Sequence, residues 1–195
     1  MVSALRKKAV KVTPTRNMLD TLITSKTRIK LLLKFFLNSN SSSYLRGLES
    51  EFGESSNAIR VELNRFEKAG LLTSFMKGNK KMFHADTGHP LFREIHNLLL
   101  KHIGFNQIID NVTSRLGDVK IVYLIGDFAK GKDSKIIDLL FVGNNIDKEY
   151  LIRKVSQTEK LISRKIRFLV YKDVDYKNIL RDYKDSEILL LWKEE

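Results

Sequence analysis

Apolar residues recur at three- and four-residue spacings through the first third of the chain, which predicts a series of short helices. The first is expected to run from Ser25, whose side chain suits a helix N-cap, to about residue 37. Residues 38–43 are a loop rich in Ser and Asn, and two more helices are expected over residues 44–52 and 56–69. The residues predicted to face inward are Ile29, Leu32, Leu33, Phe36, Leu37, Leu45, Leu48, Phe52, Ile59, Leu63 and Phe66.

The pattern changes after the third helix. Gly70 stands where the end of a helix needs left-handed backbone. Two short strands are expected at residues 71–76 and 81–85, and Gly78-Asn79 between them is a signal for a two-residue hairpin turn. Three helices followed by a hairpin are the elements of a winged helix-turn-helix.

The second half of the chain predicts a helical segment and then a small α/β domain. Residues 90–116 carry two apolar stripes divided by Gly104, strand-like runs occupy residues 121–125, 138–142 and 166–171, and helices are expected at residues 148–162 and 174–181. The predicted fold class is α+β. Its parts are a basic flexible arm at residues 1–16, a winged helix-turn-helix at residues 17–88, a helical linker or dimerisation segment at residues 89–117, and an α/β domain at residues 118–195.

The charge of the chain indicates a polyanionic partner. The net charge is +12, and residues 1–104 hold 18 Lys and Arg against 8 Asp and Glu. DNA is the commonest partner for such a surface, although solubility alone or an anionic membrane surface are alternatives. The sequence contains no cysteine, its apolar runs are far shorter than a membrane span, and no signal peptide is evident, so we expect a cytoplasmic protein.

The segment from Tyr44 to Leu72, YLRGLESEFGESSNAIRVELNRFEKAGLL, resembles the winged-helix regulators of the ArsR and MarR type. The strongest part of the resemblance is Leu63, Phe66 and the run Ala69-Gly70-Leu71-Leu72, which in that family ends the recognition helix and starts the wing. The resemblance covers roughly residues 20–90. It implies binding to double-stranded DNA.

The polar face of the third helix offers the candidate DNA-reading residues. If Ile59, Leu63 and Phe66 face inward, the opposite face presents base-reading side chains and the helix N-terminus presents phosphate-binding ones. The candidates are Ser55, Ser56, Asn57, Arg60 and Asn64 on the helix and Lys77, Lys80 and Lys81 on the hairpin. Two alternatives remain open: a merely solvated face, on which Glu62 and Glu67 would repel phosphates, and a module for protein interaction.

The segment from Val122 to Val142, VYLIGDFAKGKDSKIIDLLFV, resembles the signature of small nucleotidyltransferases of the polymerase-beta type. In that family a strand ends in Gly-Ser, a basic Gly-containing loop follows, and the next strand carries Asp-x-Asp. Gly126, Ala129 and Gly131 fit the loop, and Asp138 fits the second carboxylate. The alternative is an ordinary loop between a strand and a helix.

The departures from that signature indicate a catalytically inactive relative. Ile136 replaces the first Asp of the pair, Asp127 stands in place of the Ser, and Arg167 stands where a third carboxylate is inferred. Transfer of this kind needs two metal ions held by clustered carboxylates, which Asp138 alone does not supply. We therefore expect no catalytic residue, no metal site and no cofactor. Gly126, Asp127, Gly131 and Asp138 are a possible vestigial nucleotide loop, where an unidentified effector or nucleotide could bind.

The leading hypothesis is a sequence-specific DNA-binding transcriptional regulator, and the competing one is an active nucleotidyltransferase with an appended winged helix. A homodimer is expected, because one winged helix reads only a short half-site. The apolar stripes of residues 90–116, including Leu98, Ile108 and Val112, are the expected contact. The spacing of His84, His89, His96 and His102 does not indicate a metal site.

Overall fold

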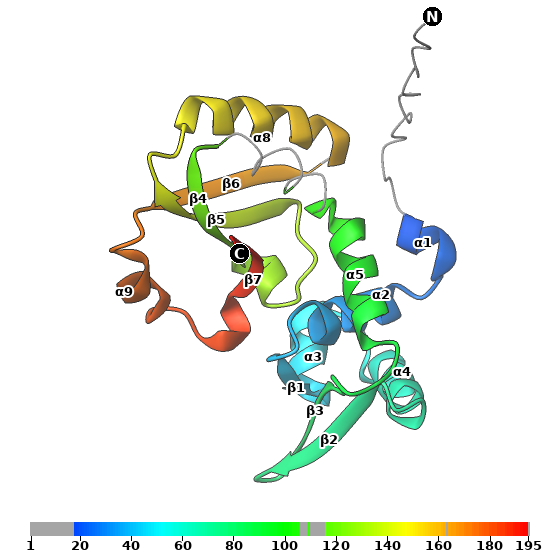
Figure 1. Cartoon of the computed structure of the whole chain (residues 1–195). Helices are drawn as coiled ribbons and strands as arrows, with labels where there is room; N and C mark the ends of the chain where they lie inside the picture. The colour runs from blue at the N-terminus through cyan, green and yellow to red at the C-terminus, as the bar shows by residue number, and fades with distance from the viewer. Residues whose placement is uncertain (1–17, 106–108, 110–115, 163, 195) are drawn as a thin grey trace, which may run out of the picture.

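The computed structural model describes residues 18–105, 109, 116–162 and 164–194, which form a mixed α+β fold with two separate sheets (Figure 1). The basic arm expected at residues 1–16 lies outside the described residues, as do Ile108 and Val112 of the second apolar stripe. Every helix within the described part of the chain is too short or too polar to span a lipid bilayer.

The N-terminal helices follow the predicted apolar periodicity. After α1 (Met18–Leu22), Ser25 caps α2 (Lys26–Leu32) by accepting a hydrogen bond from the backbone N–H of Arg28 at 3.2 Å. The last turn of this helix is a π-helix, η1 (Leu33–Leu37), in which all residues except Lys34 are buried. π-helical turns are rare in proteins overall, and those that occur are often found at functional sites.

The next elements form a helical pair and a three-stranded sheet. They are β1 (Ser42–Tyr44), α3 (Leu45–Phe52), α4 (Ser56–Lys68), β2 (Leu72–Lys77) and β3 (Lys80–Ala85). Ile59, Leu63 and Phe66 of α4 are buried, as the sequence predicts. The strands are antiparallel, in the order β1-β3-β2. The sequence did not predict β1, because residues 38–43 were expected to form a loop.

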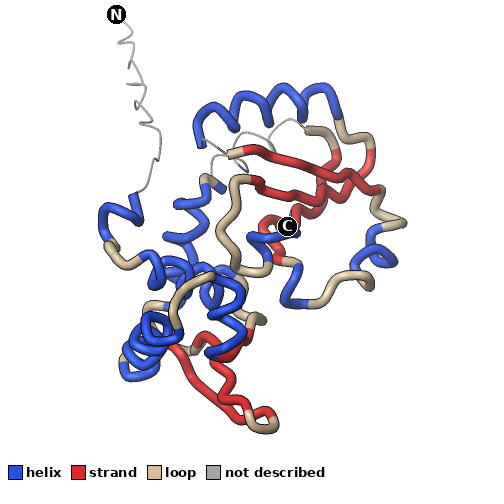
Figure 2. The backbone as a smooth tube through the Cα atoms, turned by 180° about the vertical axis from the view of Figure 1, so that it is seen from behind, coloured by secondary structure: helices blue, strands red, loops and turns tan. Residues whose placement is uncertain are grey.

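The hairpin of β2 and β3 projects away from the rest of the molecule (Figure 2). Its last strand pair is Lys77 with Lys80, so Gly78 and Asn79 form the two-residue turn that the sequence predicts. Gly78 has a φ of +61°, which a side chain would strain.

Helix α5 (Phe92–Ile103) connects this unit to the second sheet and ends at Gly104, whose φ is +89°. Leu99 and Ile103 are buried, and Leu98 is half-buried against the same core. Much of the first apolar stripe is therefore used within the chain. The dimer expected at this segment stays a prediction.

The second sheet has the strand order β6-β5-β4-β7, in which only β5 and β6 run parallel. Its strands are β4 (Asp118–Ile125), β5 (Ile136–Asn144), β6 (Lys165–Tyr171) and β7 (Leu189–Lys193). The short helix α7 (Gly126–Ala129) follows β4, where the sequence predicted only a loop. Helix α8 (Lys148–Ile162) has the predicted bounds, whereas α9 (Tyr176–Leu180) is shorter than expected and is followed by η3 (Asp185–Glu187).

The two faces of this sheet are covered differently. One face packs on α8 through Leu151 and Val155 and belongs to a core that continues into the N-terminal helices. The other face buries a smaller cluster that includes Leu140 and Val142, which packs against Tyr176 and Leu180 of α9 and against other aromatic and aliphatic side chains. Side chains alternate between the two faces along a strand. Asp138 therefore lies on the same face as Leu140 and Val142, and Arg167 on the same face as Tyr171, so both belong to this second face.

Candidate nucleic-acid interface

A groove of about 600 Å³ lies between α3, α4 and the free edge of β3. Strand β1 ends at Tyr44, opposite Met82, so the part of β3 nearer the hairpin tip has no strand neighbour on that side within the described part of the chain. The groove is lined by Tyr44, Leu45, Arg46, Arg60, Leu63, Asn64, Asn79, Lys80, Lys81 and Phe83. Four of these side chains are cationic, and none is acidic.

The groove brings together four of the eight residues proposed from the sequence, namely Arg60, Asn64, Lys80 and Lys81. Arg60 and Asn64 lie one helical turn apart on the exposed face of α4. Lys80 stands over the ring of Tyr44, with 4.4 Å from its Nζ to the ring centroid. This contact holds the ammonium group in the lining of the groove without neutralising its charge.

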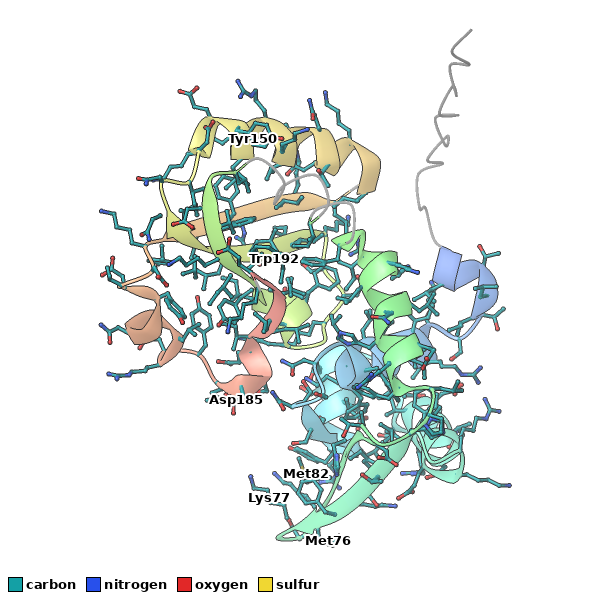
Figure 3. All side chains as sticks on the ribbon, viewed as in Figure 1. Met76, Lys77, Met82, Tyr150, Asp185 and Trp192 are labelled. Atoms are coloured by element: carbon teal, nitrogen blue, oxygen red, sulfur yellow. The ribbon has the colours of Figure 1, made fainter. Side chains whose placement is uncertain are left out.

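The other four proposed residues lie outside this groove. Ser55 is the N-cap of α4, and its Oγ accepts a hydrogen bond from the N–H of Ala58 at 3.2 Å. Ser56 is half-buried and Asn57 is exposed at the same helix end. Lys77 lies at the hairpin tip beside Met76 (Figure 3).

Glu62, which the sequence suggested would repel phosphates, is buried and neutralised. Its side chain is 7% exposed and accepts hydrogen bonds from Nε of Arg28 at 2.9 Å and from NH1 of Arg65 at 3.1 Å. Burial alone would raise the pKa of the Glu62 carboxyl, but the hydrogen bonds from Arg28 and Ser25 and the positive charges of Arg28 and Arg65 bring it below its ordinary value. The expected repulsion is thus removed.

Glu67 is held on the side of the hairpin. Its carboxylate accepts hydrogen bonds from Lys81 Nζ at 2.8 Å and from Ser74 Oγ at 2.6 Å, and these bonds lower its pKa. The same contact occupies Lys81, whose charge is therefore partly offset within the protein. Lys80 and Arg60 have no such partner among the described residues.

Sequence reasoning missed Arg46 and Tyr44, which line the groove from the start of α3. Both are in the segment that resembles winged-helix regulators. Tyr44 and Lys80 are 36 residues apart on the chain, and the pairing of β1 with β3 brings them together, so no local pattern indicates their contact.

The candidate vestigial loop forms a second, smaller hollow of about 320 Å³ on the sheet. Its lining includes Gly126, Lys130, Asp138, Arg167 and Glu187. Arg167 donates to both oxygens of Asp138, from Nε at 2.6 Å and from NH2 at 3.0 Å, and this contact raises the pKa of Arg167. The register of β5 and β6 sets Arg167 directly beside Asp138.

The remaining residues of that loop are used by the fold. Gly126 has a φ of +71°, and an added Cβ would lie 2.4 Å from Oδ2 of Asp138. Asp127 is exposed at the start of α7. Lys130 pairs with Glu187 at 3.3 Å, and Gly131 packs on the backbone of η1.

Comparison with known proteins finds partial likenesses in structure only. No protein-family model and no curated protein sequence matches the chain. Reduced HlyU from Vibrio cholerae is similar at 14% identity and a TM-score of 0.34, over 43% of this chain and 82% of its own. The transcriptional regulator BldR from Sulfolobus solfataricus is similar at 16% identity and a TM-score of 0.35, over 53% of this chain and 75% of its own.

A third solved structure, a protein from Sulfolobus solfataricus assigned as a nucleotidyltransferase, is similar at 22% identity and a TM-score of 0.34. That likeness covers 56% of this chain and 94% of the other. At such TM-scores these likenesses carry no argument about function.

Proposed function

We propose that the protein is a sequence-specific regulator that binds double-stranded DNA through the groove between α3, α4 and β3. The observation that carries this proposal is the separation of charge around α4. Arg46, Arg60 and Lys80 have no ion pair among the described residues, while Glu62 is paired with Arg28 and Arg65 and Glu67 with Lys81. Three unpaired cations on one surface attract phosphates.

The proposed roles follow from the side-chain chemistry. Arg60 and Asn64 project from α4, where Arg pairs bidentately with guanine and Asn with adenine in a major groove. Lys77 and Lys80 of the hairpin, Arg46 of α3, and Ser55, Ser56 and Asn57 at the helix N-terminus suit backbone phosphates. Arg60 and Asn64 would determine which DNA sequence is preferred. The phosphate-binding residues would set the affinity and its salt dependence.

The test is fluorescence anisotropy of the full chain with random and selected duplexes at two salt concentrations. Arg60→Ala should weaken binding to a selected site by about 1–3 kcal/mol and reduce the preference for that site over random DNA. Arg153→Ala on α8 is the matched control, because Arg153 is exposed and far from the groove. No DNA affinity at low salt would overturn the proposal.

We further propose that the hollow at Asp138 has no nucleotidyl-transfer activity. Asp138 is bound at both oxygens by Arg167, so its negative charge is already compensated. Two metal ions repel each other and need several shared carboxylates, whereas Ile136 stands where the related family has the first one. Asp182 and Glu187 also line the hollow, but no three acids or histidines among the described residues are grouped so that they could hold a metal ion. An assay with labelled nucleoside triphosphates and magnesium or manganese should show no incorporation. Incorporation that is lost in Asp138→Ala would instead establish the competing enzyme.

A further inference from the structure

A polar hollow of about 310 Å³ lies at the boundary between the N-terminal helices and the second sheet. Three chain segments meet there: residues 40–42 of the Ser/Asn-rich loop, residues 130–132 after α7, and residues 186–187 of η3. Lys34 of η1 and Glu51 of α3 complete the lining. This hollow is separate from the proposed DNA groove.

The side chain of Asn38 holds the three segments together. Asn38 is 1% exposed, and its Nδ2 lies 3.0 Å from the carbonyl oxygen of Ala129, 3.1 Å from that of Asp185 and 3.2 Å from that of Ile188. Its Oδ1 accepts the N–H of Asn40 at 3.1 Å. Asp185 lies at the end of its unit that faces the N-terminal helices (Figure 3).

The lining offers more donors and positive charge than the protein itself uses. Lys34 pairs with Glu51 at 3.0 Å and Lys130 pairs with Glu187 at 3.3 Å, but Lys132 has no ion pair among the described residues. Ser41 is 2% exposed, and its Oγ has no hydrogen-bond partner within the described part of the chain. A buried hydroxyl without a protein partner is costly, so the Ser41 hydroxyl gains from a hydrogen bond to a bound molecule.

We propose that this hollow binds a phosphate group of a small ligand. The excess positive charge of Lys132 selects an anion, and the hydroxyls of Ser41 and Ser42 donate to its oxygens. The volume accommodates a phosphate with a modest substituent, such as a nucleotide. Binding itself does not depend on the proposed DNA function.

The site is placed to affect the DNA groove. Ser41 and Ser42 lead directly into Tyr44, which lies under Lys80 in that groove. A ligand that draws residues 40–42 towards residues 130–132 would therefore alter the position of β1 and of the start of α3. This consequence, unlike the binding, rests on the proposed function.

The experiment is isothermal titration calorimetry of the full chain with inorganic phosphate and, separately, with ATP, at constant ionic strength set by chloride. Saturable binding of at least one of them is expected, and Lys132→Gln should weaken it about fivefold to tenfold. Lys135→Gln is the matched control, since Lys135 is exposed, close in sequence and outside the hollow. Stronger binding of ATP would identify a nucleotide as the ligand, and equal affinity would identify the phosphate group alone.

Ser41→Ala separates a ligand role from a structural one. Removing a buried hydroxyl without a partner should leave the thermal stability unchanged or raised, yet weaken phosphate binding about tenfold. A loss of stability together with unchanged binding would overturn the proposal. So would the absence of saturable binding, or binding equally strong in Lys132→Gln. Phosphate binding with no DNA affinity would overturn only the DNA function.

Discussion

The groove beside α4 and the hollow at Asp138 are both lined by cations, but only the groove has several cations without an ion pair among the described residues. In the groove, Arg46, Arg60 and Lys80 are exposed and have no ion pair among the described residues, whereas Lys81 is paired with Glu67. In the hollow, Arg167 is bound to Asp138 and Lys130 to Glu187. A count of basic residues therefore does not locate a polyanion site, because pairing decides which charges remain available.

The loop after α7 and the tip of the β2–β3 hairpin also differ in how tightly a glycine is enclosed. The largest predicted loss of stability follows from that difference. Gly131 has a φ of +74°, and an added Cβ would lie 2.4 Å from Cα of Lys34. Gly131→Ala combines left-handed strain with overlap against η1, so it should lower the free energy of unfolding by about 2–5 kcal/mol. Urea denaturation followed by the fluorescence of Trp192 measures it.

The control for that substitution is Gly78→Ala at the hairpin tip. Gly78 has a φ of +61°, but no atom lies within 4 Å of the added Cβ. Only the strain of left-handed backbone remains, which is about 1–2 kcal/mol. Equal losses of stability in the two variants would show that the packing of Gly131 on η1 contributes nothing.

The second prediction concerns the paired acid of α4. Glu62→Ala leaves Arg28 and Arg65 without their partner, and because Arg28 is partly exposed we expect a loss of about 2 kcal/mol, less than for a fully buried pair. The folded-state pKa of Glu62 is lowered, so its contribution is present above the ordinary value of 4.5 and is lost as the pH falls through the lower folded value. Thermal denaturation of wild type and Glu62→Gln from about pH 3 to about pH 7, a range that spans the titration of carboxyl groups, tests this sign.

Much of the N-terminal unit could be predicted from sequence because its signals are local. The N-cap Ser25, the left-handed Gly70 and the hairpin turn at Gly78-Asn79 each act within a few residues. The bounds of α8 were also predicted, since a long amphipathic helix has a clear period.

The contacts that decide the sites are distant in sequence, and no local pattern carries them. Glu62 is neutralised by Arg28, 34 residues earlier, and Asn38 reaches the carbonyl of Ile188, 150 residues later. The sequence did not predict β7, because the strand is defined by its pairing with β4, which lies far away along the chain. The placement of Arg167 beside Asp138 was inferred from a family resemblance, and the register of β5 and β6 provides it.

The third prediction separates a free cation from a paired one on adjacent residues of β3. Lys80→Gln should lower the slope of log affinity against log salt by about one unit, since one phosphate contact is lost. Lys81→Gln should lower it less, because Glu67 already offsets the charge of Lys81 at 2.8 Å. Anisotropy titrations at several salt concentrations measure both slopes. Equal changes would mean that the ion pair of Lys81 opens when DNA binds.

The smallest expected effect is that of Asp138→Ala on DNA binding, which should be nil. Asp138 faces Arg167 on the second sheet, and neither residue lines the groove of α4. Removing the carboxylate frees the guanidinium of Arg167, which makes the hollow more positive without adding a cation to the groove. Specific and random duplexes should therefore bind the variant as they bind wild type in anisotropy titrations. If affinity for both rises together, DNA extends over the second sheet, and the contrast between the free cations of the groove and the paired ones of the hollow must be redrawn as a single continuous surface.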